Sequence, residues 1–75
     1  MAKQTPLKKL REARGLSQAA VAKAVGLTQS GYHRIESAEG ARADNAAKIA
    51  KYFGSEISEE MILYPMRFKS WNPVS

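Results

Sequence analysis

Cysteine is absent from this sequence of 75 residues. Without it, the chain can form neither a disulfide framework nor a thiolate metal site. No apolar run approaches the roughly 20 residues that a membrane-spanning helix needs, and residues 1–10 do not have the pattern of a secretory signal. We therefore expect a soluble chain that works in the cytoplasm and has no membrane partner.

Groups that carry out catalysis are equally scarce. The only histidine is His33, no His, Cys and Asp residues stand at metal-ligand spacing, and no glycine-rich phosphate loop is present. Enzymatic chemistry needs at least a converging pair of polar groups. We predict that the protein is not an enzyme and has no catalytic residue, metal site, cofactor or small-molecule ligand.

The charge balance is basic, with a net charge of +5 and a pI of about 9.8. Basic residues predominate in residues 1–54, whereas the only charged side chains in residues 55–64 are acidic. A basic balance does not by itself identify a polyanionic partner. It becomes evidence for DNA when it accompanies a DNA-binding motif.

Such a motif is found in residues 17–37, where two short helical patterns are joined by Gly26. Ser17 and Thr28 are good N-caps, because a hydroxyl can accept a hydrogen bond from an otherwise unpaired amide. Helical spacing places four apolar residues on the inward faces: Val21, Val25, Tyr32 and Ile35. Four polar residues remain outside on the second helix, predicted over residues 29–37: Gln29, Ser30, His33 and Arg34. This pattern is typical of a helix-turn-helix whose second helix enters the DNA major groove.

Three further helices are predicted around the motif. Thr5 and Pro6 begin the first, whose buried stripe consists of Leu7, Leu10 and Ala13. Asp44 caps the fourth helix, whose apolar side consists of Ala46, Ala47, Ile49, Ala50 and Phe53. The fifth starts at Ser58 and ends before Pro65. The sequence thus predicts an all-α fold of five helices.

The last residues are predicted to form a tail. Apolar and basic side chains alternate over residues 66–69, which predicts a short extended segment. Burial of Met66, Phe68 and Trp71 would stabilise so small a protein, so we expect this tail to cover the core or to form a homodimer contact. We therefore divide the chain into a helix-turn-helix DNA-binding domain, residues 1–64, and a C-terminal tail, residues 65–75.

Residues 7–54, with the strings LREARGLSQAAVAKAVGLTQSGYHRIE and AKIAKYFG, resemble the Xre family of helix-turn-helix regulators. This family includes phage Cro proteins and the N-terminal domains of phage repressors. The resemblance implies a compact five-helix domain of the lambda-repressor type that binds double-stranded operator DNA as a two-fold symmetric dimer. We therefore expect a phage- or plasmid-type transcriptional repressor that binds a palindromic operator as a homodimer, in a bacterial cytoplasm and on the nucleoid when bound.

The resemblance also implies the roles of individual residues. Gln18 matches a position that contacts a DNA phosphate, and Gln29 matches a glutamine that bonds an adenine edge. Arg34 matches a base-reading or phosphate-contacting position, and guanine is the natural base partner of arginine. The expected base-reading residues are Gln29, Ser30 and Arg34. Thr28 and His33 are expected to contact a base or a phosphate. The expected phosphate contacts are Gln18, Lys23 and Arg42.

One match to the family and one departure from an ordinary helix sequence concern the fold of the motif. Arg11 and Glu36 match a structural ion pair that joins the first helix to the end of the recognition helix. Gly31 lies inside that helix, where glycine costs about 1 kcal/mol relative to alanine. Either a side chain there would collide with the groove wall, or the helix simply tolerates a weak residue.

A second function is consistent with the same sequence. An antitoxin-type helix-turn-helix protein also binds a protein partner, and the apolar tail with Phe68 and Trp71 would serve such a role. A copurifying partner would distinguish this alternative from the repressor. RNA binding is disfavoured, because the outer face of the second motif helix lacks exposed aromatic residues for stacking.

Overall fold

Most of the α-helices begin directly after a residue whose side chain caps them. In the computed structural model, which describes residues 4–54 and 56–73, four helices have a hydroxyl side chain at the N-cap. Each hydroxyl accepts a hydrogen bond from a backbone N–H three residues further on, at 3.1–3.3 Å. The four caps are Thr5, Ser17, Thr28 and Ser58. Thr5, Ser17 and Thr28 were predicted as caps and Ser58 as the start of its helix, and each hydroxyl satisfies an amide that the helix leaves unpaired.

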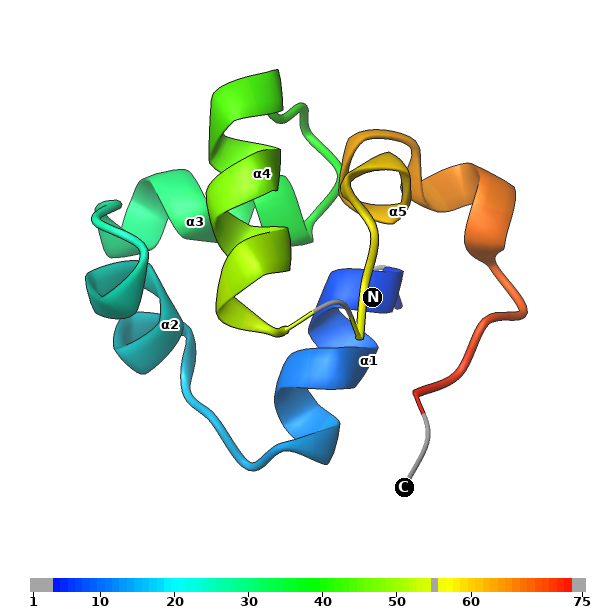
Figure 1. The fold of residues 1–75 in the computed structure, drawn as a ribbon, viewed down its shortest axis with the longest axis horizontal. Coiled ribbons are helices and arrows are strands. Elements are labelled where there is room, and N and C mark those ends of the chain that lie inside the picture. Colours follow the sequence, from blue (N-terminus) through cyan, green and yellow to red (C-terminus); the bar gives the residue numbers. More distant parts are fainter. Residues whose placement is uncertain (1–3, 55, 74–75) are drawn as a thin grey trace.

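The described residues form five α-helices and one short 3₁₀ helix, and they contain no strand. The elements are α1 (Pro6–Ala13), α2 (Gln18–Ala24), α3 (Gln29–Glu36), α4 (Ala43–Tyr52), α5 (Glu59–Leu63) and η1 (Pro65–Phe68). In Figure 1, α4 lies near the centre, with α2 and α3 on one side and α5 on the other. Within residues 4–54 and 56–73, no helix has both the length and the apolar character needed to cross a membrane. The predicted all-α, five-helix fold is confirmed.

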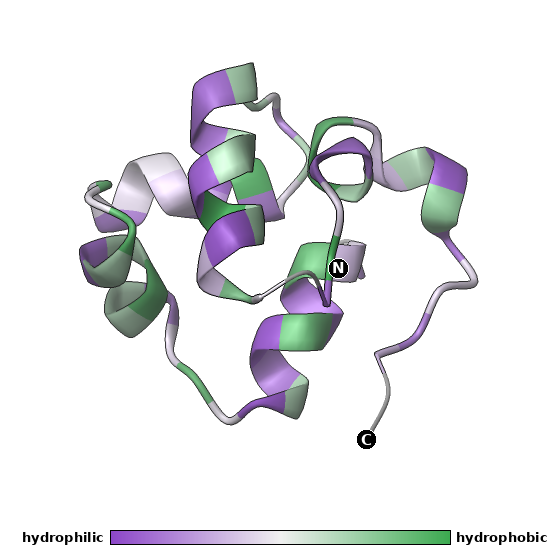
Figure 2. Cartoon of the chain, in the orientation of Figure 1, coloured by the Kyte–Doolittle hydropathy of each residue, from purple (hydrophilic) through white to green (hydrophobic). Residues whose placement is uncertain are grey.

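The core forms where the apolar faces of these helices meet. Hydrophobic and hydrophilic residues share the surfaces of α1, α2 and α4, as Figure 2 shows, and the hydrophobic ones supply the interior. The buried core consists of Leu7, Leu10, Val21, Ala22, Val25, Tyr32, Ile35, Ala46, Ile49, Phe53, Ile57 and Ile62. All four residues predicted to face inward from the two motif helices belong to it.

Two local predictions are wrong. Asp44 does not cap α4, because the N-cap lies two residues earlier, at Arg42, which makes no side-chain capping bond. Asp44 instead lies in the first turn, where its negative charge still suits the positive end of the helix dipole. Ala13 is exposed rather than buried. Three residues advance an α-helix by 60° less than a full turn, so two such steps from Leu7 carry Ala13 off the buried face.

The tail also differs from its predicted form. Residues 65–68 form the 3₁₀ helix η1 instead of an extended segment, and Met66 is 47% exposed rather than buried. Trp71 nevertheless packs against the core. The Nζ of Lys9 on α1 donates hydrogen bonds to the backbone carbonyls of Lys69 and Trp71, both at 2.9 Å. These contacts fasten residues 69–71 to α1.

Replacing Trp71 with alanine is expected to lower the stability of the domain. A partly buried indole contributes about 1 kcal/mol, which corresponds to a fall in Tm of about 4–8 °C for a domain of this size. Thermal unfolding followed by circular dichroism measures the change. Met66→Ala, at an exposed apolar position in the same tail, is the matched control and should melt close to the wild type. Equal melting of the two variants would show that the tail does not support the core.

Candidate nucleic-acid interface

The outer face of α3 is polar and accessible. Four of its side chains are exposed: Gln29, Ser30, His33 and Arg34. On the opposite face, Tyr32 and Ile35 are buried in the core. The core therefore fixes the rotation of the helix about its axis, and the residues predicted to read bases are presented together to solvent.

A short turn fixes α3 relative to α2. Gly26 has φ of +76°, a left-handed conformation that L side chains rarely adopt. The N–H of Leu27 donates to the carbonyl of Ala22 at 2.8 Å, which closes the end of α2, and Thr28 then caps α3. The two helices pack directly on each other. This arrangement is that of a helix-turn-helix, with the N-terminal part of α3 exposed.

An ion pair ties α3 to α1. The Arg11 Nε lies 2.8 Å from Glu36 Oε2, and its Nη2 lies 2.9 Å from Glu36 Oε1, so the pair is bidentate. The side chains are only 11% and 2% exposed. Burial alone would raise the pKa of Glu36, but the hydrogen bonds from Arg11 and Gln18 outweigh burial and lower it. The structure thus brings the predicted pair together with both of its charges intact.

Other groups complete the surroundings of this pair, and the sequence did not predict them. Arg11 Nη1 donates to the carbonyl of Leu16 at 2.6 Å. The hydroxyl of Thr5, the cap of α1, donates to the carbonyl of Glu36 at 2.6 Å. The end of α3 is therefore fastened to both ends of α1. A backbone carbonyl is present at every residue, so the spacing of residue types in the sequence does not predict which carbonyl a side chain will contact.

A family comparison agrees with this geometry. Residues 7–59 match the family model described as helix-turn-helix, of the Cro/C1 type. The chain belongs to this family. Comparison with curated proteins and with solved structures finds no match. The match spans the motif and all four helices from α1 to α4, so this helix-turn-helix protein is a regulator that binds double-stranded DNA.

Gln18 has an unexpected position in this helix-turn-helix protein. It is the first residue of α2, and its Nε2 lies 3.0 Å from Glu36 Oε1 and 3.2 Å from His33 Nδ1. The side chain predicted to contact a phosphate is therefore already bonded to α3. Its role toward DNA stays a prediction.

Lys23 and Arg42, the two basic residues predicted to contact phosphates, are both exposed. Lys23 lies in the last turn of α2. Arg42 lies in the loop before α4, and its Nε is 3.7 Å from Asp44 Oδ1, in a pair whose side chains are 84% and 63% exposed. An ion pair that is this exposed contributes little to stability. Arg42 can therefore leave Asp44 and bind a phosphate.

Gly31 has a local reason of its own. A Cβ at this position would lie 3.0 Å from the hydroxyl of Thr28, which accepts a hydrogen bond from the Gly31 N–H itself. That approach is tighter than an ordinary contact. Glycine here therefore leaves room for the cap of α3, a reason that applies in the absence of DNA.

Tyr32 departs from an ordinary core residue. Its hydroxyl is buried and has no hydrogen-bond partner among the residues that the structure describes. Burial raises the pKa of Tyr32, and the negative charge of Glu36 raises it further. The phenol is therefore neutral, and Tyr32 serves this helix-turn-helix as a large core side chain.

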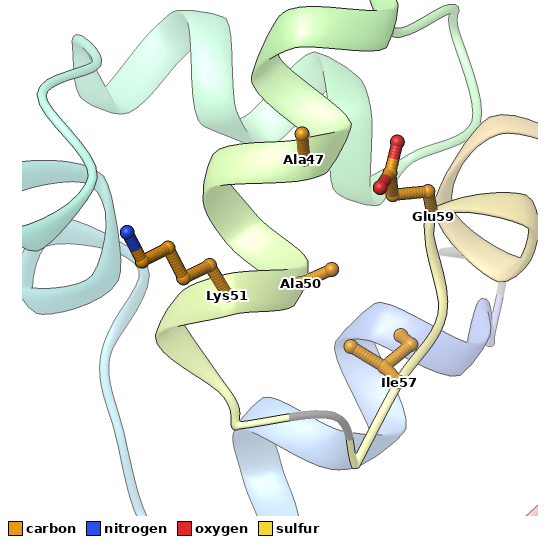
Figure 3. Close-up of a pocket in the computed structure, with 5 residues that line it drawn as sticks. All are labelled: Ala47, Ala50, Lys51, Ile57 and Glu59. Carbon is orange, nitrogen blue, oxygen red and sulfur yellow. The ribbon is translucent and has the colours of Figure 1, made fainter.

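Two features away from α3 bear on other kinds of binding site. Residues 4–54 and 56–73 contain no group of three His, Cys, Asp or Glu residues that could hold a metal ion. An open cleft between α4 and α5 is lined by Ala47, Ala50, Lys51, Ile57 and Glu59. In Figure 3, the Lys51 side chain extends toward α2, away from Glu59. The two charged groups of the cleft therefore do not converge on a ligand.

Proposed function

We propose that this DNA-binding regulator is a phage- or plasmid-type repressor that binds a palindromic operator as a homodimer. The observation that carries the proposal is the exposed polar face of α3, presented by a buried opposite face. A helix of this kind places its N-terminal side chains against base edges in the major groove. Bound there, the repressor would exclude other proteins from the operator, in the cytoplasm and on the nucleoid.

The proposed contacts divide into reading and positioning. The Gln29 amide can bond N6 and N7 of adenine together, and the Arg34 guanidinium can bond O6 and N7 of guanine. Ser30 lies beside them, and Thr28 and His33 contact either a base or a phosphate. Lys23, Arg42 and Gln18 are assigned to phosphates. No catalytic step, metal or cofactor takes part.

Selection of binding sites from random DNA, followed by sequencing, tests the proposal. A dimer with two recognition helices should enrich two half-sites related by a two-fold axis, with centres about one helical turn, or a multiple of it, apart. Enrichment of a single unrepeated site would contradict the homodimeric operator complex. Enrichment of no sequence at all would contradict specific binding.

The proposed phosphate role of Arg42 predicts a change in salt dependence. Arg42→Ala should weaken binding to the selected operator and to mixed-sequence DNA by the same factor, because phosphate contacts carry no base information. The slope of log K against log salt should become shallower by about one unit. Filter binding over a series of salt concentrations measures both quantities.

Arg67→Ala is the matched control, because Arg67 is an exposed arginine whose guanidinium lies 4.5 Å from the ring centroid of Tyr64, in the tail. It should leave the salt slope unchanged. An equal change of the salt slope in both variants would contradict a specific phosphate contact of Arg42. A change of base preference in Arg42→Ala would also contradict that role.

The apolar residues exposed near η1 support the homodimer and also favour a second candidate. Tyr64 is 51% exposed and Met66 47% exposed, beside a cleft lined by Ala38, Leu63, Tyr64, Pro65, Met66 and Arg67. These residues can contact a second copy of the chain or, in an antitoxin, a protein of another kind. Sedimentation of the purified protein distinguishes the two. A self-associating chain supports the repressor dimer, and a monomer that copurifies with a different protein supports the antitoxin.

A further inference from the structure

A chain of hydrogen bonds crosses from α2 to α3 beside the proposed DNA-binding face. It begins at Ser37, the C-cap of α3, whose Oγ lies 3.4 Å from His33 Nε2. It continues from His33 Nδ1 to Gln18 Nε2 at 3.2 Å, and from the same Nε2 to Glu36 Oε1 at 3.0 Å. Glu36 in turn holds Arg11. One amide nitrogen therefore joins the exposed histidine to the buried ion pair.

The chemistry of these groups fixes where each proton lies. An ionised carboxylate only accepts hydrogen bonds, so Gln18 must turn its NH₂ group toward Glu36. The second hydrogen of that NH₂ group then points to His33 Nδ1, which must act as an acceptor. His33 is therefore neutral in this arrangement, with its proton on Nε2 and directed to the Ser37 oxygen. Both hydrogens of the Gln18 amide are in use.

This has a consequence for phosphate binding. A phosphate oxygen accepts hydrogen bonds, and the part of the Gln18 amide left over is its carbonyl oxygen, which is also an acceptor. For Gln18 to donate to a phosphate, one of its two bonds must break. The bond to Glu36 is part of the buried ion pair, whereas the bond to His33 lies at the exposed end. The hydrogen bond between Gln18 and His33 is therefore the one that can break at lower cost.

We propose that His33 is a positioning residue that controls the Gln18 amide, and that DNA binding takes up a proton at His33. Protonation of Nδ1 removes the acceptor and places two donors opposite each other, so the imidazolium moves away and a phosphate oxygen can accept from the same Gln18 N–H, while the other N–H keeps its bond to Glu36. The inference rests on the proposed function, because it takes Gln18 as a phosphate contact, and it replaces the direct base or phosphate contact assigned there to His33.

The charges around His33 give the sign of the effect. On α3, Arg34 is its neighbour in sequence, and Glu36 faces it through the Gln18 amide. Lys23 is the only ionisable side chain of α2, five residues beyond Gln18. From α1, Arg11 reaches this region but is neutralised by Glu36. A proton on His33 therefore adds one positive charge and frees one donor, and both changes strengthen the attraction for a phosphate.

Binding to DNA as a function of pH tests the inference. The probe is a short fluorescein-labelled duplex of mixed sequence at fixed salt, because a phosphate contact does not depend on base identity. As the pH falls from about 8 to about 5.5, the wild type should bind about tenfold more tightly. His33→Gln keeps a neutral acceptor for Gln18 and should remove this dependence. Gln18→Ala should also reduce it, because His33 then controls no donor.

The outcomes are separable. If His33→Gln retains the full pH dependence, the effect does not come from His33 and the inference fails. If Gln18→Ala retains it while His33→Gln does not, His33 contacts the phosphate by itself and the positioning role fails. If the duplex is not bound at any pH, the proposed function fails, and the inference fails with it.

A measurement without DNA tests the hydrogen bond directly. His33 is the only histidine, so its imidazole nitrogens give unambiguous NMR signals. At about pH 8 the Nε2–H tautomer is expected, and the side-chain NH₂ signals of Gln18 should move as the pH is lowered to about 5.5. In His33→Gln those signals should not move over the same range. A neutral His33 with its proton on Nδ1 would overturn the inference even if DNA binding depends on pH.

Discussion

Glu36→Ala is expected to lower the free energy of unfolding by about 3–5 kcal/mol. The substitution removes both carboxylate oxygens that accept hydrogen bonds from the Arg11 guanidinium, whose side chain is only 11% exposed, and leaves it the uncharged carbonyl of Leu16. A buried charge without a partner costs far more than the pair contributes when it is intact. The Glu36→Ala substitution also removes an acceptor of the Gln18 amide. Urea denaturation followed by circular dichroism measures the loss.

An exposed ion pair in the same protein is the matched control. Arg14 and Glu56 form a salt bridge whose side chains are 32% and 42% exposed, and Glu56→Ala should cost no more than about 1 kcal/mol. Similar losses in the two variants would show that burial of the Arg11–Glu36 pair does not determine its contribution to stability.

The contribution of Glu36 to stability should also depend on pH. Because its pKa is lowered in the folded state, the stabilisation is present above the ordinary pKa of glutamate, about 4.3, and is lost as the pH falls through the folded value.

Local signals explain how much of the fold could be predicted. Thr5, Ser17 and Thr28 were predicted as caps, and Ser58 as a helix start, because a capping hydroxyl acts on an amide only three residues away. The inward faces of α2 and α3 were predicted because helical periodicity alone decides which residues share a side. These parts of the structure depend on interactions within a few residues of chain.

The wrong predictions show where local signals compete. Alternation over residues 66–69 indicated an extended segment, but Pro65 has a fixed φ that suits the first turn of a helix, and η1 begins there. Asp44 was predicted as a cap, yet it lies in the first turn of α4, two positions after the N-cap, where its negative charge suits the helix dipole. In both cases two local preferences favoured different structures, and the packing of the folded chain determined which of the two formed.

The candidate site was predicted only in part. The exposure of Gln29, Ser30 and Arg34 follows from periodicity, but the contact of Gln18 with His33 and Glu36 does not. It joins residues 15 and 18 positions apart and depends on how steeply α2 and α3 cross. A crossing angle is set by core packing and by the Gly26 turn together, so no spacing rule in the sequence encodes this contact.

Gln29→Ala is expected to weaken binding to the selected operator by about 1–3 kcal/mol and to relax the preference at one A·T position in each half-site. Gln29 is the first residue of α3 and is exposed, so its amide can approach a base edge without a change in the core. Alanine removes both its donor and its acceptor. Binding to mixed-sequence DNA, which depends on phosphates, should change little. Titrations of operator and mixed-sequence duplexes at one salt concentration give the ratio that matters.

The matched control for this substitution is Gln4→Ala. Gln4 is also an exposed glutamine, but it precedes α1 and has no place in the proposed interface, so the ratio of operator to mixed-sequence affinity should stay at the wild-type value. A wild-type ratio in Gln29→Ala as well would mean that the N-terminal end of α3 does not face the bases. The exposed face of α3 would then bind something other than base edges. The assignment of Ser30 and Arg34 to base reading would also be wrong, because both residues lie on the same face of the helix as Gln29.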